Sequence, residues 1–270
     1  MTVSVNNQVC YYKDRGEGDI ILLVHGNPDS ADIWDDLITI LQANYRCIAP
    51  DLPGFGRSEI SSDFVFNLDS FSNWLDSFLK AIDVKDAVHL VIHDVGTFFA
   101  LPWAIKHSNR IQSITVTNTL FFSDYKWHFW ARIWRSPIIG EVSNWFTSKR
   151  LFKDELKKGG PLLTDAFIDK SYPHVTSKMK KTVLKLYRAM NPEVFKGWED
   201  KYLALTKIKP ILVVWGEKDP YIPLSFGYAE RFANGQDLFK LPKCGHWVAA
   251  EMPQELANRM TQFLEKINLL

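Results

Sequence analysis

The chain has 270 residues, a formal net charge of +1 and a hydrophobic content of 46%. This length can bury the core of one large domain, and the balanced charge predicts neither nucleic acid nor a membrane as a partner. Three widely spaced cysteines fit neither a disulfide framework nor a metal site, and the N-terminus lacks a secretory pattern. No run approaches the roughly 18 apolar residues of a membrane span. We therefore expect a cytoplasmic monomer or homodimer without a metal or other cofactor.

Short apolar segments alternate with longer amphipathic ones along most of the chain. In chain order the pattern predicts strand 19–26, helix 31–44, strand 45–51, helix 68–83, strand 86–94, helix 96–108, strand 111–119, and later strand 209–219, helix 227–232, strand 237–242 and helix 253–267. Continuous apolar strands alternating with helices predict a parallel sheet that is covered on both faces. Ligands of such sheets bind at the carboxyl ends of the strands.

The segment 120–205 interrupts this alternation. It is helical in pattern and rich in aromatic residues. We interpret it as a helical cap, or lid, inserted into a core domain made of residues 1–119 and 206–270. A few extra surface helices that cover no site are the alternative.

A carboxylate stands where strand 86–94 ends and helix 96–108 begins. The stretch "IHDVGT" places Asp94 in the context of a nucleophile elbow, a sharp turn that exposes one side chain at the top of a sheet. Gly96 supplies a small residue after it, although Ile92 stands where many such turns have glycine. The alternative is that Asp94 only caps the following helix.

Three further strand ends carry residues that can act together with Asp94. "VHGNP" can point the backbone N–H of Asn27 toward Asp94, "WGEKDP" places Asp219 in a turn, and "KCGHW" places His246 on a loop after the last strand. Glu217 is the rival of Asp219 for the role of the acid. The chain order nucleophile, acid, histidine is the order of the triad on one hydrolase fold.

These stretches resemble the α/β-hydrolase fold family over nearly the whole chain. The matching segments are "HGNP", "DLPGFGRS", "HDVG", "GEKDP" and "GHW". The resemblance implies an α/β fold with a mostly parallel eight-stranded sheet, helices on both faces and a helical cap after strand six. By position it implies that Asp94 is the nucleophile, His246 the general base and Asp219 the acid that orients the histidine. The backbone N–H groups of Asn27 and Val95 would form the oxyanion hole.

An aspartate nucleophile narrows the reaction. A carboxylate is already ionised near pH 7, gains little by attacking an ester, and suits displacement at a saturated carbon, which gives an alkyl-enzyme ester. Water activated by His246 would then attack the carbonyl carbon of Asp94. The aromatic lid predicts a small apolar organic substrate, with water as the second reactant. Epoxide opening and carbon–halogen cleavage both fit this chemistry.

The epoxide hypothesis depends on acidic donors in the lid. "SDYKWHFW" and "KLYRAMNP" resemble cap segments of epoxide hydrolases, which implies that Tyr187, with His128 or Tyr125, polarises the epoxide oxygen. Aromatic packing within the lid is the alternative for each of these three side chains.

The halide hypothesis depends on N–H donors. "HGNP" and "LVIHD" resemble haloalkane dehalogenases, in which the asparagine side chain contacts the halide, so Asn27 and Trp127 are candidates for substrate binding. Val95 departs from that family, which has tryptophan after the nucleophile, and from fluoroacetate dehalogenases, which have arginine there. We therefore expect an epoxide hydrolase, with a haloalkane or haloacid dehalogenase as the alternative. A non-catalytic member of the fold that binds a small molecule is the second alternative.

Overall fold

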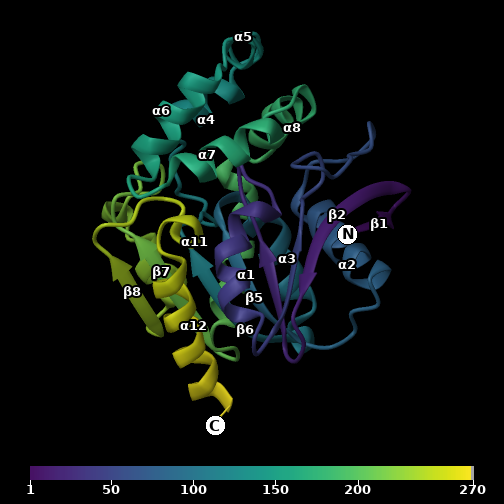
Figure 1. Cartoon of the computed structure of the whole chain (residues 1–270), viewed down its shortest axis with the longest axis vertical. Helices are drawn as coiled ribbons and strands as arrows, with labels where there is room; N and C mark the ends of the chain where they lie inside the picture. The colour runs from purple at the N-terminus through teal and green to yellow at the C-terminus, as the bar shows by residue number, and fades with distance from the viewer. Residues whose placement is uncertain (269–270) are drawn as a thin grey trace.

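A central sheet lies between two layers of helices in the computed structural model, which describes residues 1–268 (Figure 1). The strands are β1 (Thr2–Val5), β2 (Gln8–Arg15), β3 (Ile20–Val24), β4 (Arg46–Pro50), β5 (Val88–His93), β6 (Ile111–Thr117), β7 (Ile211–Gly216) and β8 (Asp237–Leu241). Their order in the sheet is β1-β2-β4-β3-β5-β6-β7-β8. Only the β1–β2 and β2–β4 pairs are antiparallel. The prediction of an eight-stranded, mostly parallel sheet is confirmed.

Twelve α-helices are described within residues 1–268. They are α1 (Asp35–Leu41), α2 (Leu68–Ala81), α3 (Thr97–Lys106), α4 (Phe129–Arg135), α5 (Ile139–Trp145), α6 (Lys149–Gly159), α7 (Asp165–Ser171), α8 (Ser177–Ala189), α9 (Trp198–Leu205), α10 (Tyr228–Ala233), α11 (Val248–Glu251) and α12 (Pro253–Asn268). The short 3-10 helices are η1 (Ala31–Trp34), η2 (Asp94–Gly96), η3 (Ser108–Arg110), η4 (Tyr172–His174), η5 (Pro192–Phe195) and η6 (Leu224–Phe226). None of the helices in this part of the chain combines the length and the apolar character that crossing a membrane requires.

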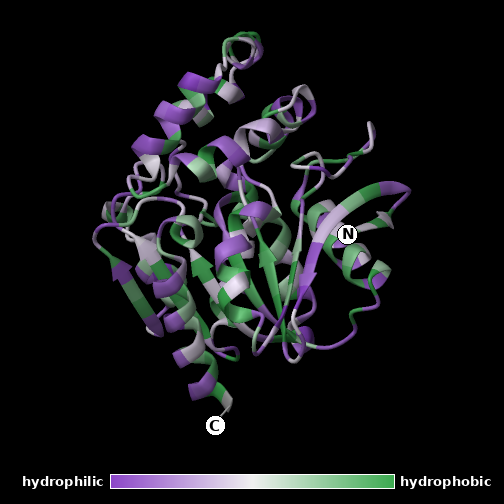
Figure 2. Cartoon of the chain, viewed as in Figure 1, coloured by the Kyte–Doolittle hydropathy of each residue, from purple (hydrophilic) through white to green (hydrophobic). Residues whose placement is uncertain are grey.

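The central strands are mostly apolar because both faces of the sheet are buried. In β3, Ile20, Leu22 and Val24 belong to the apolar cluster that includes α2 and α3, whereas Ile21 and Leu23 belong to the cluster that includes α1 and α12. All residues of β3, β5 and β7 are buried, and Figure 2 shows these strands as the hydrophobic centre of the molecule. Such strands are typical of a sheet that helices cover on both sides.

Helices α4 to α9 all lie between β6 and β7 in the chain. Whereas α9 packs on α3, helices α4 to α8 gather at one end of the sheet, at the top of Figure 1, opposite the C-terminus. We refer to α4 to α9 together as the helical insertion. The position of α4 to α8 places them over the carboxyl ends of β3, β5 and β7, where the polar residues of the sequence motifs lie.

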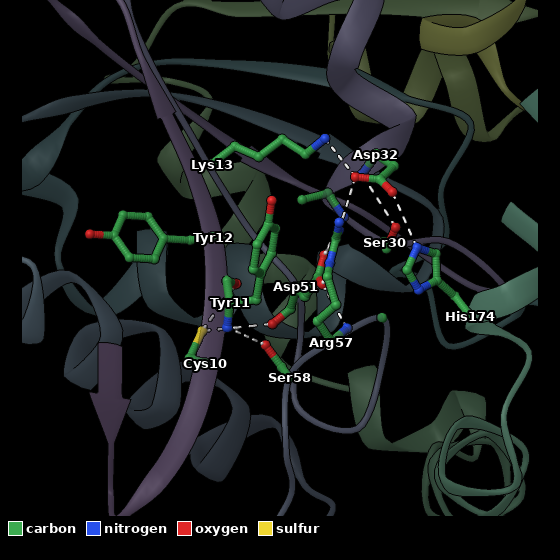
Figure 3. A network of polar contacts seen from close by, with 12 residues as sticks. Cys10, Tyr11, Tyr12, Lys13, Ser30, Asp32, Asp51, Arg57, Ser58 and His174 are labelled. Carbon is green, nitrogen blue, oxygen red and sulfur yellow. Dashed lines mark hydrogen bonds and ion pairs between the residues drawn. The ribbon is translucent and has the colours of Figure 1, made fainter. Parts of the chain in front are cut away.

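A buried polar network fastens the insertion to the core (Figure 3). Asp51, which is fully buried, accepts hydrogen bonds from the backbone N–H of Ala31 (2.7 Å) and from the Arg57 side chain (2.8 Å). The same Arg57 pairs with Asp32 at 2.9 Å, and Asp32 lies 3.1 Å from His174 of η4. Buried charges are tolerated when they are paired in this way. The "DLPGFGRS" motif therefore holds the loop after β3 and one end of the insertion together.

Candidate active site

Asp94 lies on a tight turn between β5 and α3. Its φ of +47° is a left-handed backbone conformation that is uncommon for aspartate and occurs at strained functional turns. The turn fits because two neighbours are glycines: a Cβ on Gly26 would lie 2.4 Å from the Asp94 Cβ, and a Cβ on Gly96 would lie 2.4 Å from the His25 carbonyl oxygen. The backbone N–H of Asp94 also donates to the Asn118 carbonyl at 3.1 Å. The loops after β3, β5 and β6 thus fix the Asp94 side chain.

The carboxylate of Asp94 is buried but hydrogen-bonded. The backbone N–H of Asn27 donates to its Oδ2 at 2.8 Å. Burial raises the pKa of Asp94, while the charge of His246 and the N–H groups of Asn27 and Val95 act in the opposite direction. The Asn27 N–H therefore points at the Asp94 carboxylate, and the Val95 N–H also acts to keep that carboxylate ionised.

His246 lies between two carboxylates. Its Nδ1 is 2.8 Å from Asp219 Oδ2 and its Nε2 is 3.8 Å from Asp94 Oδ1. Burial lowers the pKa of His246, but the adjacent charges of Asp219 and Asp94 outweigh it and raise the pKa to about 9. The imidazole is therefore held as a cation while both carboxylates are ionised.

Asp219 is held by three donors from two loops, those after β6 and β7. Asn118 Nδ2 donates to its Oδ2 at 2.8 Å, and the backbone N–H groups of Tyr221 and Ile222 donate to its Oδ1 at 2.7 and 3.1 Å. Burial alone would raise the pKa of Asp219, but His246 and these donors bring it below the ordinary value. Glu217, the rival in the sequence, has no contact with His246 in the described residues.

The Asp94 side chain opens into a cavity of about 140 Å³ between the sheet and the insertion. A buried water needs about 10–15 Å³ on this measure, so the cavity can hold a small organic molecule. Most of its wall is apolar, and its polar lining includes Asn27, His128 and Tyr187. These features match the expected small-molecule pocket.

The predicted donors of the insertion differ in whether their protons already donate to another group of the protein. The Tyr187 hydroxyl accepts from Asn27 Nδ2 at 3.3 Å and has no acceptor for its own proton within the described residues. Tyr125 also lines the cavity, but its hydroxyl donates to the Tyr221 carbonyl at 3.1 Å. Burial raises the pKa of both tyrosines well above the ordinary value, so both keep their protons. Tyr187 is therefore the tyrosine with a free proton.

His128 and Trp127 carry further N–H groups at the cavity. His128 Nδ1 accepts from the Ala131 N–H at 3.4 Å as the N-cap of α4, and burial lowers its pKa to about 3. A neutral ring whose Nδ1 accepts a hydrogen bond carries its proton on Nε2. The buried Nε1 of Trp127 has no partner in the described part of the chain. Both residues can therefore donate a hydrogen bond to a ligand.

Asp29 lies behind the site, and no motif singles it out. It is buried, accepts a hydrogen bond from Trp247 Nε1 at 3.1 Å and lies 3.8 Å from His93 Nε2. No lysine or arginine pairs with it among residues 1–268. Burial and the charge of Asp94 raise the pKa of Asp29 to about 7. A second carboxyl group therefore shares the electrostatic environment of Asp94.

The sheet, the elbow and the order of the site residues together point to one family. The model of the alpha/beta hydrolase fold family matches residues 19–253, most of the chain. This chain belongs to the α/β-hydrolase fold family. The relatives that match it over more than 90% of its length include a dienoic acid hydrolase and haloalkane dehalogenases, which supports an α/β-hydrolase enzyme, whereas two oxetanone decarboxylases match 41% and 43% of it.

Three relatives illustrate the range of the family. A 2-hydroxy-6-oxo-6-(2'-aminophenyl)hexa-2,4-dienoic acid hydrolase of Metapseudomonas resinovorans is 26% identical over 94% of this chain and 87% of its own. Haloalkane dehalogenase 2 of Mycobacterium tuberculosis is 25% identical over 92% of this chain and 88% of its own. The structure of a meta-cleavage product hydrolase from Pseudomonas fluorescens superposes with a TM-score of 0.82 at 19% identity, covering 98% of this chain and 97% of its own. At these identities the comparison supports the fold and a hydrolase, and leaves the substrate open.

The residues that the motifs singled out in this α/β-hydrolase converge on one cavity. Asp94, Asn27 and His246 line it, and Asp219 lies directly behind His246. The motifs do not single out Asn118, whose side chain bonds both Asp219 and the backbone of Gly216. Its position directly after the apolar strand 111–117 is the one signal in the sequence that points to it.

Proposed function

We propose that this α/β-hydrolase opens epoxides by forming an ester on Asp94. The observation that carries the proposal is the position of the Asp94 carboxylate, 2.8 Å from the Asn27 N–H and 3.8 Å from His246 Nε2 in an apolar cavity. An oxygen of Asp94 attacks an epoxide carbon, and the carbon–oxygen bond of the ring breaks. Water deprotonated by His246 then attacks the ester carbonyl, which releases a diol and restores the carboxylate.

The charges around His246 support this order of steps. In the free enzyme the ionised Asp94 is one of the groups that raise the pKa of His246 to about 9, so the ring holds a proton. Esterification removes the charge of Asp94, and the pKa of His246 then falls toward the operating pH, so the ring releases a proton that balances the one Tyr187 gives to the alkoxide. A general base works best with a pKa near that pH. His246 thus becomes a base only after the ester has formed, with Asp219 holding its Nδ1 at 2.8 Å.

The donors of the insertion support an oxygen leaving group. Tyr187 has a free hydroxyl proton, and the neutral His128 ring presents Nε2–H, with the two rings 6.3 Å apart between centroids. Both can donate to the ring oxygen as negative charge develops on it, and Tyr187 can pass its proton to the alkoxide. General acid catalysis of this kind contributes about 10²–10⁴-fold. Tyr125 is the weaker candidate because its proton is engaged with the Tyr221 carbonyl.

Carbon–halogen cleavage is the second candidate, and one observation favours it. The Trp127 Nε1 at the cavity has no partner in the described residues, and Asn27 Nδ2 faces the same cavity. Two N–H donors could hold a departing halide, and several relatives are named haloalkane dehalogenases. Against it, Val95 supplies no side-chain donor beside Asp94.

Replacing His246 with Gln tests the ester intermediate. The variant keeps the alkylation step and loses the base, so intact-mass spectra with substrate should show an adduct that maps to the peptide containing Asp94. Styrene oxide and 1-bromobutane serve as the two probes, with diol and halide measured in the wild type. An unmodified Asp94 peptide under conditions in which the wild type turns the probe over refutes the ester mechanism. Halide release without diol formation would refute the epoxide assignment and leave the ester mechanism intact.

A further inference from the structure

Large apolar side chains gather on the outside of the helical insertion. Trp145 is 86% exposed, Ile138 76% and Phe146 70%. Four more exposed apolar residues lie on the same stretch: Phe129, Ile139, Val142 and Leu151. We call these seven residues the apolar patch. Soluble monomers rarely expose such concentrations of apolar surface, and those that do mostly use them for binding.

The patch lies on the outer side of helices whose inner sides are already packed. Helices α4 and α5 pack on each other and on α8. Ala131 of α4 and Gly140 of α5 are buried in these contacts, whereas the patch is covered by nothing in residues 1–268. Helix α5 forms the end of the molecule that lies farthest from the C-terminus (Figure 1). A flat partner can therefore reach the patch without touching the core.

Charge is divided unevenly between this part of the chain and the rest. The segment 120–205 holds 16 Lys and Arg against 9 Asp and Glu, a formal charge of +7. The rest of the chain holds 16 against 22, a formal charge of −6. The net charge of +1 conceals this asymmetry, which is typical of proteins that meet an anionic surface. Within the stretch of the patch, the exposed Arg132 has no carboxylate partner in the described residues.

The patch also continues into the cavity that holds Asp94. Leu151 is 51% exposed and at the same time lines the cavity. Trp130, Asn144 and Thr147, from the same stretch of helices, line it as well. A molecule that leaves a surface in contact with the patch can thus reach the cavity without crossing bulk water.

We propose that the apolar patch docks this enzyme on the surface of an anionic lipid bilayer and that apolar substrates enter the cavity from the lipid. Trp and Phe side chains prefer the headgroup region of a bilayer, and Lys and Arg near the surface add electrostatic attraction. A second copy of the chain is the less suitable occupant, because a symmetric contact through this patch would bring two segments of charge +7 together. The proposal concerns where the substrate comes from and holds for either leaving group.

Vesicle flotation with the full chain tests the proposal. Wild-type protein should float with vesicles of phosphatidylcholine and phosphatidylglycerol at low salt, and much less with phosphatidylcholine alone or at high salt. The double variant Trp145→Ser, Phe146→Ser should bind the anionic vesicles at least about tenfold more weakly. A matched double variant, Ile208→Ser, Phe226→Ser, removes exposed apolar side chains outside the segment and should bind like the wild type.

Two further measurements distinguish a loss of membrane binding from a loss of folding or activity, and from dimerisation. Neither Trp145 nor Phe146 lines the cavity, so their double variant should keep the urea midpoint of the wild type and its turnover of a water-soluble substrate. Wild type that fails to bind anionic vesicles overturns the proposal, as does equal binding by both double variants. Analytical ultracentrifugation tests whether a second copy of the chain binds the patch instead. If the wild type dimerises, the Trp145 and Phe146 double variant does not, and neither binds vesicles, the patch is an interface between copies and the proposal is overturned.

Discussion

Asp29→Asn should stabilise the protein, and more so as the pH rises. The Asp29 carboxyl is buried, accepts one hydrogen bond from Trp247 Nε1 and has no cationic partner among residues 1–268 except the neighbouring His93, 3.8 Å away. Burial lowers the pKa of His93 well below its ordinary value, so that ring stays neutral. An ionised Asp29 is therefore a buried charge that only the His246 cation, shared with Asp94 and Asp219, offsets, whereas the amide of asparagine keeps the acceptor for Trp247 and carries no charge.

The size of the effect follows from the pKa of Asp29. The pKa rises from the ordinary value of 3.8 to about 7 in the folded protein, first because of burial and then because of Asp94. A raised acid pKa means that the folded state holds a proton that the unfolded state has already lost, so stability falls as the pH rises from about 4 to about 7. At 1.36 kcal/mol per pKa unit the full cost is about 4 kcal/mol, and about 3 kcal/mol of it develops between pH 5 and pH 8.

Urea unfolding at pH 5 and pH 8, followed by tryptophan fluorescence, measures this difference. The gain of Asp29→Asn over the wild type should be larger at pH 8 by about 3 kcal/mol. Asp86→Asn is the matched control, because Asp86 is exposed and its carboxylate has no partner in the described residues; its effect should not change with pH. If Asp29→Asn has the same effect at both pH values, or is less stable than the wild type at pH 8, the Asp29 carboxyl has no raised pKa and the reasoning fails.

Three other substitutions test the site itself. Tyr187→Phe should lower kcat/KM for epoxides by about 100-fold, because the free hydroxyl proton is lost, and should leave halide release from a bromoalkane unchanged. Asp219→Asn should leave ester formation intact and slow ester hydrolysis at least about 100-fold in single-turnover experiments, because His246 loses the partner that sets its tautomer and raises its pKa. Gly26→Ala should cost about 1–3 kcal/mol in urea unfolding and slow ester formation, since the new Cβ would lie 2.4 Å from the Asp94 Cβ. Loss of halide release in the first variant, loss of ester formation in the second, or wild-type behaviour of the third would contradict these expectations.

The central strands and their order along the chain were predictable because burial on both faces leaves a continuous apolar run. Strands β3 to β7 follow from such runs, and the short stretch 237–242 also predicted the partly exposed edge strand β8, whereas β1 and β2 at the other edge were not predicted. In β2 the buried and exposed positions do not alternate strictly and three charged residues interrupt the apolar ones, so the sequence shows no clear two-residue period. The predicted helix 31–44 is divided into η1, whose first turn is capped by the Ser30 side chain, and α1, which begins at Asp35 and ends at Leu41.

Residues at strand ends were predictable because parallel strands bring their carboxyl ends together. Asp94, Asp219 and His246 follow this rule. Contacts between loops do not follow from local patterns: Asp29 meets Trp247 from 218 residues away. Motif resemblance likewise ranked Tyr125 beside the other donors, although its hydroxyl is engaged by the Tyr221 carbonyl, which no sequence pattern indicates.

The charges of the site change between the two halves of the proposed reaction. Three carboxyl groups, Asp29, Asp94 and Asp219, surround a single protonated His246, and Asp94 also has a left-handed backbone. In the proposed mechanism esterification removes the Asp94 charge, which relieves its repulsion with Asp29 and frees His246 to lose its proton. The hydrolysis step must then restore a buried carboxylate beside Asp29, so the electrostatic cost falls on the second half of the reaction. Asp219, with its three hydrogen-bond donors, stabilises the imidazolium that forms in that half, which is where this arrangement needs a fixed negative charge most.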